Sequence, residues 1–259
     1  MTLTESGPQV GSLLKGWRER RRLTQLQLAV DTEISTRHLS FVETGRSRPT
    51  PAMIDRLAGS LEVPLRERNA LFLAAGYAPQ YTEGDLRSPA LHAVADAFRT
   101  LLDAHMPHPA LVLDRWWNVI DRNAATDLLL RGCSAELLEP PVNAVRLSLH
   151  PDGLAPRVRN LGQWRSFLLG QVQHRYQRTG DPLLKELLDE TAAYPAAPEL
   201  AEASRDVVVP LRIVVDGQEL SFFSIAASVL SATDVTVDDL HIEAFYPADP
   251  ATARALAPA

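Results

Sequence analysis

A short run of small polar and basic residues carries the most specific chemistry in this sequence. Thr36, Arg37 and Ser40 fall on one side of a helical segment, while Leu39 and Val42 fall on the other. Hydroxyl and guanidinium groups can hydrogen-bond the base edges that the major groove of DNA exposes. The spacing therefore predicts a helix that reads base pairs and rests its apolar side on a small domain.

Groups suited to phosphate oxygens flank this segment. Helix N-termini and basic loops are common phosphate ligands, and both occur close to the reading helix. The expected DNA contacts are Thr24, Gln25, Ser35, Thr36, Arg37, His38, Ser40, Arg46, Ser47 and Arg48. Among these we expect His38 to face a phosphate or the helix cap rather than a metal. Nearby Phe41 fits either the core or a contact with a thymine methyl group.

The elements that must position these residues are short helices. Thr24 and Gln27 form a capping box that begins one helix. Ser35 is a good N-cap for the next helix, which reaches Glu43. Similar signals predict one helix before this pair and two after it. Residues 10–80 should therefore form an all-α unit of five helices that contains a helix-turn-helix.

Composition divides the chain into two predicted domains. Residues 1–80 hold 11 Lys and Arg against 8 Asp and Glu, whereas residues 81–259 hold 15 against 24. A basic N-terminal domain followed by an acidic domain is the charge distribution expected of a DNA-binding protein with a second domain. Residues 76–90 are rich in Gly, Pro and polar residues, as linkers are. We expect a DNA-binding domain with its linker at 1–83 and a second domain at 84–259.

The segment 23–79 resembles the helix-turn-helix of the Xre family, related to phage repressors, most specifically in STRHLSFVETGRSRP. The resemblance implies that helix 24–30 lies over the DNA backbone and that helix 35–43 enters the major groove. It also implies that Glu43 holds the domain together rather than touching DNA. Glu33 replaces a glycine that is frequent in the family's turn. A left-handed backbone at Glu33 would cost about 1 kcal/mol.

The rest of the chain has the pattern of an α+β domain. Residues 110–123 read as two short strands joined at Asp114-Arg115, after which Asn123 would cap a helix. The middle, 157–193, has helical periodicity, and Asp216-Gly217 predicts a hairpin turn. The last predicted strand alternates apolar Leu240, Ile242, Ala244 and Tyr246 with polar His241 and Glu243, which predicts one buried face. Strands near both ends indicate an antiparallel sheet.

Residues 90–256 resemble the ligand-binding domain of MmyB-like regulators, which has a PAS-like fold. The stretches that carry the resemblance are ALVLDRWWNVIDRN, NAVRLSLHPDGLAPRVRNLGQW, DVVVPLRI and HIEAFYPADPATARAL. The resemblance implies an apolar cavity between sheet and helices, with fatty-acid-like molecules as one ligand class. The candidate pocket residues are Trp116, Trp164, Phe167, Arg212, Phe223 and Phe245. The aromatic residues also fit a plain core, and Arg212 also fits an outer strand face.

The sequence carries no signature of catalysis or of a metal or cofactor site. It lacks a G-x-S-x-G elbow, a phosphate-binding loop and a G-x-G-x-x-G turn. His105 and His108 are separated by Pro107 and have no thiol or acidic partner that would complete a metal site. We therefore expect no catalytic residues, no metal and no cofactor.

Composition also favours a cytoplasmic protein. The single cysteine, Cys133, excludes an intrachain disulfide, which fits a reducing compartment. No apolar run approaches the roughly 20 residues that span a bilayer, and the N-terminus lacks the regions of a signal peptide. The expected partners are double-stranded DNA and a small effector, bound by a homodimer without membrane contact.

Two alternatives stay open on the sequence alone. The chain could be an enzyme of small-molecule metabolism that carries a DNA-binding head, which a catalytic constellation in the second domain would favour. It could also be a protein-interaction module, because the apolar pattern of five helices fits an interaction bundle. A stoichiometric protein partner would favour that second alternative.

Overall fold

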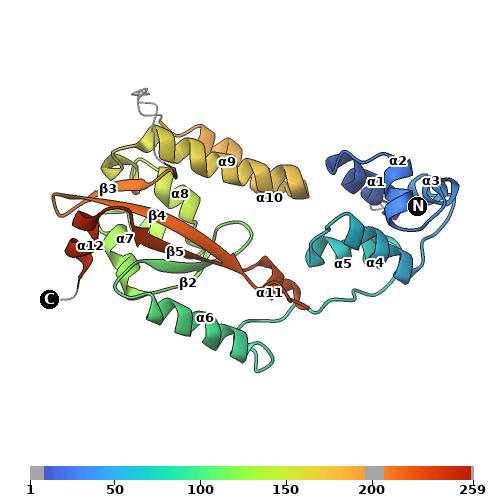
Figure 1. Ribbon diagram of the computed structural model, residues 1–259, viewed down its shortest axis with the longest axis horizontal. Helices are drawn as coiled ribbons and strands as arrows, with labels where there is room; N and C mark the ends of the chain where they lie inside the picture. The colour runs from blue at the N-terminus through green and yellow to red at the C-terminus, as the bar shows by residue number, and fades with distance from the viewer. Residues whose placement is uncertain (1–8, 196–206, 258–259) are drawn as a thin grey trace, which may run out of the picture. The chain divides into compact units, whose positions relative to one another are not determined.

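The structure is a computed structural model that describes residues 9–195 and 207–257 (Figure 1). The described residues pack into two compact units. The first holds the residues up to Gly84 together with Gln177–Thr179 and Ser231–Asp238. The second holds Asp85–Tyr176, Gly180–Leu230 and the residues from Asp239 onward.

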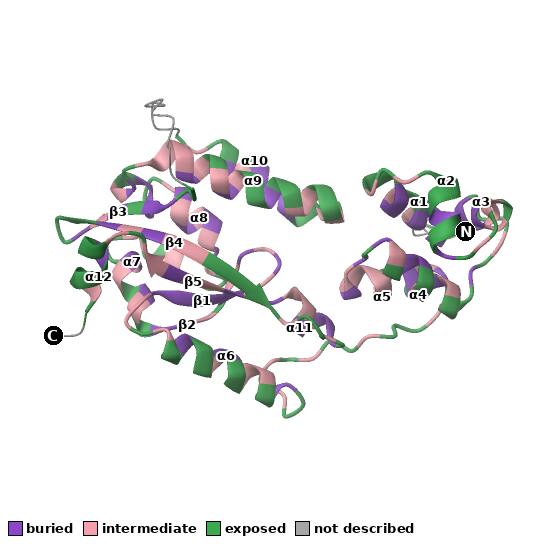
Figure 2. Cartoon of the chain, in the orientation of Figure 1, coloured by how far each residue is buried: buried purple, intermediate pink, exposed green. Residues whose placement is uncertain are grey.

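The first unit is built on five short helices. They are α1 (Val10–Arg20), α2 (Gln25–Asp31), α3 (Thr36–Glu43), α4 (Pro51–Ser60) and α5 (Leu65–Ala74). One apolar core joins them, and its buried members include Leu14, Trp17, Leu28, Leu39, Val42, Ile54, Leu57 and Phe72. Figure 2 colours the buried residues of these helices purple. The predicted all-α unit of five helices is confirmed.

Local hydrogen bonds set the ends of the two central helices as the sequence predicts. The Thr24 hydroxyl accepts from the Gln27 backbone N–H at 3.2 Å, and the Gln27 side chain accepts from the Thr24 N–H at 2.8 Å. The Ser35 hydroxyl caps α3 by accepting from the His38 backbone N–H at 3.2 Å. Glu33 is left-handed with φ of 54°, so the strain expected of a non-glycine residue in this turn is present. Gly45 takes φ of 73° just beyond α3.

One glycine allows α1 to approach α3 closely. A Cβ atom built on Gly11 would lie 2.2 Å from the carbonyl oxygen of Val42 and 2.8 Å from that of Glu43. Real Cβ atoms do not come so close to backbone atoms. The position therefore requires a residue without a side chain, and it brings α1 against the C-terminal end of α3.

A segment from late in the chain completes the first unit. Asp234 accepts hydrogen bonds from the Thr82 hydroxyl at 2.8 Å and from the Gly84 backbone N–H at 3.1 Å. Asp238 accepts from the Leu65 N–H at 3.0 Å, at the start of α5. These residues surround α11 (Val235–Asp239), so the first unit is discontinuous in sequence.

The second unit contains a five-stranded antiparallel sheet in the order β2-β1-β5-β4-β3. Its strands are β1 (Ala110–Leu113), β2 (Val119–Arg122), β3 (Leu211–Val215), β4 (Gln218–Ser228) and β5 (His241–Pro247). The predicted hairpin turn between β3 and β4 is confirmed, because Asp216 and Gly217 have φ of 50° and 81°. Two successive left-handed residues are the signature of a type I′ turn.

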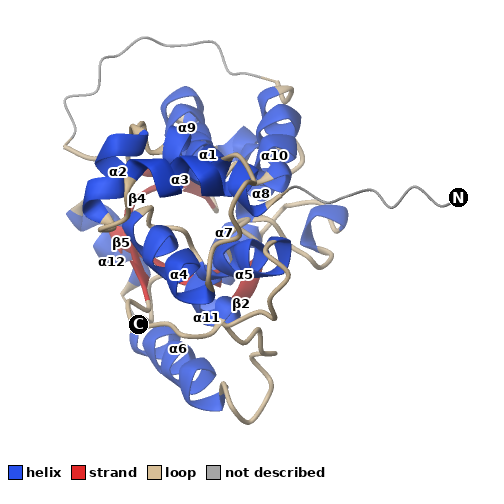
Figure 3. Ribbon diagram, turned by 90° about the vertical axis from the view of Figure 1, so that its right-hand side faces the viewer, coloured by secondary structure: helices blue, strands red, loops and turns tan. Residues whose placement is uncertain are grey.

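Helices surround this sheet. They are α6 (His92–Ala104), α7 (Asp127–Leu130), α8 (Ala144–Leu149), α9 (Leu161–Thr179), α10 (Pro182–Ala192) and α12 (Pro250–Leu256). Three 3₁₀ turns lie between them, η1 (Ala124–Thr126), η2 (Glu136–Leu138) and η3 (Ala155–Arg157). In Figure 1 and in the side view of Figure 3, α8, α9 and α10 lie away from α6, which runs along the opposite side of the sheet.

Strand alternation sends side chains into two separate cores. Leu111 and Leu113 of β1 belong to the large core with α8, α9 and α10. Ala110 and Val112, the intervening residues, pack instead with Phe98 of α6. Both faces of the central strands are thus covered. The antiparallel sheet and the helices that cover it confirm the predicted α+β class.

Two local predictions in this unit were wrong. Asn123 does not cap the following helix with its side chain. Its buried amide instead donates to the carbonyl oxygens of Leu102 and His108, at 3.0 and 2.8 Å, and so joins α6 to β1. The connection of β1 to β2 is also longer than Asp114-Arg115, because it spans residues 114–118; Trp117 within it takes φ of 65°.

Candidate functional site: DNA-binding helices and a ligand cavity

The surface of α3 presents most of the predicted base-reading residues. Arg37 is exposed, whereas Thr36, His38 and Ser40 are half-buried. The Arg37 guanidinium lies 5.4 Å from the centre of the Phe41 ring, which is itself half-buried. Side chains of this kind on the outer face of a helix can reach the edges of base pairs.

A buried ion pair fixes the end of this helix inside the domain. The Glu43 carboxylate, whose residue is only 7% exposed, accepts two hydrogen bonds from Arg18, at 2.7 and 2.9 Å. The Gln25 side-chain amide adds a third at 2.8 Å. Burial by itself raises the pKa of Glu43, but the hydrogen bonds from Arg18 and Gln25 outweigh it, and the net pKa is lowered. Glu43 therefore ties α1, α2 and α3 together.

This network gives roles to Gln25 and Arg18 that the sequence did not predict. Gln25 was expected to contact phosphate, but the structure commits one of its amide hydrogens to Glu43. Arg18 was not among the candidate residues at all. Its signal is visible in retrospect, because it follows Trp17 on the buried side of α1 and is the cation that a buried Glu43 requires.

The basic loop after α3 contains two arginines in different situations. Arg48 donates to the Gly76 carbonyl oxygen at 3.1 Å and stacks 4.3 Å above the Tyr77 ring. Arg46 is exposed, and its side chain makes no ion pair or hydrogen bond with other described residues. Of the two, Arg46 has the guanidinium that is more readily available to a phosphate.

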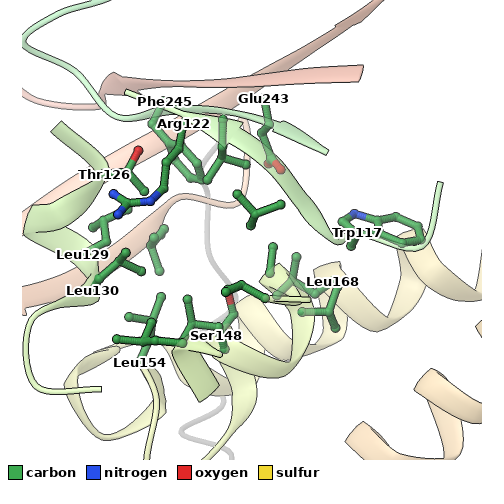
Figure 4. Close-up of a pocket in the computed structure, with 18 of the residues that line it drawn as sticks. Trp117, Arg122, Thr126, Leu129, Leu130, Ser148, Leu154, Leu168, Glu243 and Phe245 are labelled. Carbon is green, nitrogen blue, oxygen red and sulfur yellow. The ribbon is translucent and has the colours of Figure 1, made fainter. Parts of the chain in front are cut away.

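The second unit contains an apolar cavity of about 380 Å³ between the sheet, α8 and α9 (Figure 4). Most of its wall is aliphatic or aromatic, including Leu111, Trp117, Leu129, Leu130, Leu154, Trp164, Leu168 and Phe245. The polar members of the wall are Asp121, Arg122, Thr126, Ser148 and Glu243. A mostly apolar cavity with a few polar groups is the usual form of a site for a small organic ligand.

The structure brings two of the six predicted pocket residues to this cavity. Trp164 and Phe245 line its wall. Phe167 stacks on Trp164, with ring centres 5.3 Å apart, but lies outside the lining. Trp116 also lies outside it and donates its indole N–H to Asp181 at 2.9 Å.

The other two predicted residues lie elsewhere on the sheet. Arg212 is exposed and pairs with Glu219 at 3.0 Å, on the outer strand face that the sequence left as its alternative. Phe223 faces away from the cavity because it is one residue out of phase with the buried Phe222, and it stacks on Tyr246. Period-two alternation separates neighbouring residues in this way.

Sequence reasoning missed Trp117 and Glu243. The apolar alternation in β5 predicted one buried face, at Ile242 and Ala244, but the structure covers both. The face that carries Glu243 and Phe245 turns toward the cavity. Phe245 lies in phase with the polar residues His241 and Glu243, and this apolar residue was the signal that the second face is also covered.

Burial changes the protonation of the acidic and basic groups along β5. Burial raises the pKa of the Glu243 carboxyl group, and a hydrogen bond with Ser224 offsets part of that rise. Burial also lowers the pKa of His241 to about 4, and the positive charge of Arg175 contributes to the same shift. The imidazole of His241 is therefore uncharged near neutral pH, and burial shifts the Glu243 carboxyl group toward its protonated form.

In residues 9–195 and 207–257, no group of three or more His, Cys, Asp or Glu side chains is arranged to hold a metal ion. Across the same residues, every helix is too short or too polar to cross a bilayer.

Comparison with known proteins assigns both units to families. Residues 94–258, more than half of the chain, match the MmyB-like transcription regulator ligand binding domain. Residues 9–71 match a helix-turn-helix domain. The chain is 31% identical over 121 residues to the uncharacterized HTH-type transcriptional regulator RghRB of Bacillus subtilis (strain 168), which covers 46% of this chain and 84% of that protein.

A solved structure of an RNA-binding light-oxygen-voltage receptor is a distant match. It is 14% identical, with a TM-score of 0.26, and the alignment covers 98% of this chain and 62% of that one. The families that match are transcription regulators and not enzymes, so the enzyme alternative is set aside. The chain therefore belongs to the MmyB-like transcription regulators, with a helix-turn-helix domain for DNA and a separate domain for a ligand.

Proposed function

We propose that residues 1–83 recognise a specific operator through α3 and that residues 84–259 bind an apolar or amphipathic effector, with fatty-acid-like molecules as one class. The protein acts in the cytoplasm as a homodimer of the Xre type, and the effector changes its affinity for DNA. The observation that carries the DNA part is the exposed face of α3, held in place by the buried pair of Arg18 and Glu43.

The base-reading role of α3 is tested by selecting bound sequences from random duplex DNA. Arg37 is the most exposed long donor on this face. If it reads a guanine, Arg37→Ala costs about 1–3 kcal/mol at the selected site and relaxes preference at one position of each half-site. Arg22→Ala, which removes an exposed arginine outside the helix pair, serves as the control.

The possible results for Arg37 separate its roles. Equal loss of affinity on selected and random DNA would make it a phosphate contact. Unchanged binding to the selected site would remove Arg37 from the interface. The spacing of the selected half-sites also tests the homodimer, because two α3 helices reading one face of DNA lie about 34–36 Å apart.

The cavity supports the effector part of the proposal. Its volume of about 380 Å³ falls within the range of roughly 300–1,000 Å³ that is common for ligand sites. Extraction of the purified protein with organic solvent, followed by mass spectrometry, searches directly for a resident molecule. An empty extract combined with no binding of any amphiphile would leave this domain without a sensory role.

A further inference from the structure

One wall of the cavity carries a carboxyl group that has no basic partner. Glu243 lies on β5, opposite Leu111 of β1 and Ala226 of β4, on the same sheet face as Phe245. Figure 4 shows its side chain directed from the strand toward the cavity. Among the described residues it forms no ion pair. Its only polar interaction with them is the hydrogen bond with Ser224.

The charged groups around the cavity are committed to other partners. Arg122 lines the cavity but pairs with Asp127. Asp121, beside it on β2, pairs with Arg99 of α6 at 3.1 Å. The pKa of Glu243 is raised by burial, and the hydrogen bond with Ser224 opposes that rise.

Among the described residues, the elements packed against Glu243 also place no cation in an ion pair with it. His241, the nearest titratable group on the same strand face, is neutral near pH 7 because burial lowers its pKa to about 4. From α9, Arg175 lies 4.4 Å from the centre of the Trp117 ring and acts on His241 rather than on Glu243. From α8, the polar group in the cavity wall is the uncharged Ser148.

Burial and the lack of a basic partner favour the protonated form of this carboxyl group. It then has one O–H donor, and Ser224 can occupy one of its acceptor sites. Glu243 is half-buried in the cavity wall, and a donor that a bound ligand removes from water is costly unless that ligand supplies the acceptor. A carboxylate or phosphate would bring a net charge into an apolar cavity, and a cation would first require Glu243 to ionise.

We propose that Glu243 determines the ligand class: it donates a hydrogen bond to an uncharged oxygen, such as a hydroxyl or amide carbonyl, on a molecule whose hydrocarbon part fills the apolar cavity. The inference rests on the proposed function, since it assumes that this cavity holds the effector. It narrows the fatty-acid-like class to neutral amphiphiles and excludes free fatty acids as the preferred ligands.

Calorimetric titration of the full-length protein tests this with four probes that share one decyl chain. The probes are decanol, decanamide, sodium decanoate and decyltrimethylammonium, each below its aggregation concentration. We expect decanol and decanamide to bind about tenfold more tightly than decanoate at neutral pH. A factor of about ten is what one hydrogen bond contributes to affinity. Their affinity should fall as the pH rises through the pKa of Glu243.

Variants assign the preference to this side chain. Glu243→Leu removes the donor and should weaken decanol about 2–10-fold. Glu243→Gln retains an N–H donor, so it should keep decanol binding and remove its pH dependence. Glu186→Gln makes the same change at an exposed position on α10 and should have no effect. Because Glu243→Gln preserves size and polarity, it keeps the test valid if Glu243→Leu misfolds.

The outcomes distinguish this inference from the proposed function. Preferred binding of decanoate, weakened by Arg122→Gln, would overturn the inference and leave a cavity that senses fatty acids. Preferred binding of decyltrimethylammonium, lost in Glu243→Gln, would show an ionised Glu243 and would also overturn it. No binding of any probe, with an empty solvent extract, would overturn the proposed ligand-sensing function as well.

Discussion

The single carboxylate of Glu43 should make the DNA-binding unit sensitive to acid. Its pKa is lower in the folded state than in the unfolded state, where it is about 4.3. Its contribution to the free energy of unfolding is therefore complete above the unfolded pKa and is lost as the pH falls through the folded pKa. Glu43→Gln should cost about 3 kcal/mol at neutral pH, because it leaves Arg18 buried without a countercharge.

Glu19→Gln is the matched control for this prediction. Glu19 also contacts Arg18, at 3.9 Å, but its side chain is 57% exposed, so its removal should cost less than about 1 kcal/mol. Hydrogen–deuterium exchange of peptides from α1 and α3, at neutral pH and at a series of acidic pH values that passes below the unfolded pKa of about 4.3, measures both. Equal effects of the two variants would mean that the buried pair does not stabilise the helices.

Arg46 and Arg48 should contribute unequally to the salt dependence of DNA binding. Each phosphate that a protein neutralises contributes about −0.9 to the slope of log K against log salt concentration. If Arg46 and Arg48 both contact phosphates, replacing both with alanine flattens the slope by nearly two units. Because Arg48 is held by Gly76 and Tyr77, the structure favours a larger effect from Arg46→Ala alone. An unchanged slope in the double variant would place neither residue at the backbone.

At the scale of elements, two helical glycines should respond to alanine in opposite directions. Gly11 faces the carbonyl oxygens of α3, so Gly11→Ala forces α1 away and should cost about 1–3 kcal/mol. Gly59, in α4, has no atom within 4 Å of an added Cβ. Gly59→Ala should stabilise the unit by about 0.5–1 kcal/mol, since glycine is a poor helix former.

Thermal unfolding of the full-length protein compares these two variants. Both make the same chemical change in a helix, so their difference isolates the contact between α1 and α3. The DNA affinity of Gly11→Ala should also fall, because α3 loses its support. A Gly11→Ala protein as stable as the parent would mean that the two helices can separate at little cost.

The elements differ in how well the sequence predicts them. Helices with side-chain caps, such as α2 and α3, were predicted nearly to the residue because their ends depend on contacts between close neighbours. The residues of the cavity wall were not predicted as well, because they depend on which strand faces are covered by helices distant in the sequence. Phe223 and Glu243 show this: their contacts come from residues that local periodicity does not locate.

For the whole molecule, the central expectation is a coupling between cavity and operator. A ligand can change the DNA-bound population only by the difference in its affinity for the two states. A coupling of about 1–3 kcal/mol would change operator affinity about 5–150-fold. Titration of a selected operator with and without the extracted ligand measures it. A tightly bound ligand that leaves operator affinity unchanged would contradict a sensory role.

A variant that fills the cavity provides the control for this coupling. Leu168→Phe adds volume inside the wall, whereas Leu169→Phe, at the next position of α9, adds it outside the lining. Only the first should block the ligand and abolish its effect on DNA binding. If both variants respond to ligand as the parent does, the effector binds elsewhere.

The discontinuity of the first unit has a consequence for how such regulators exchange parts in evolution. Thr82 and Gly84 share the Asp234 carboxylate, and the start of α5 depends on Asp238. A gene fusion that replaced the residues before Gly84 with another DNA-binding domain would keep Asp234 and Asp238 in the ligand-binding part of the chain. A functional chimera must therefore carry residues 231–238 with the DNA-binding domain, or keep a hydroxyl donor at position 82 and backbone N–H donors at positions 65 and 84. Recombination at one crossover point does not transfer a complete module.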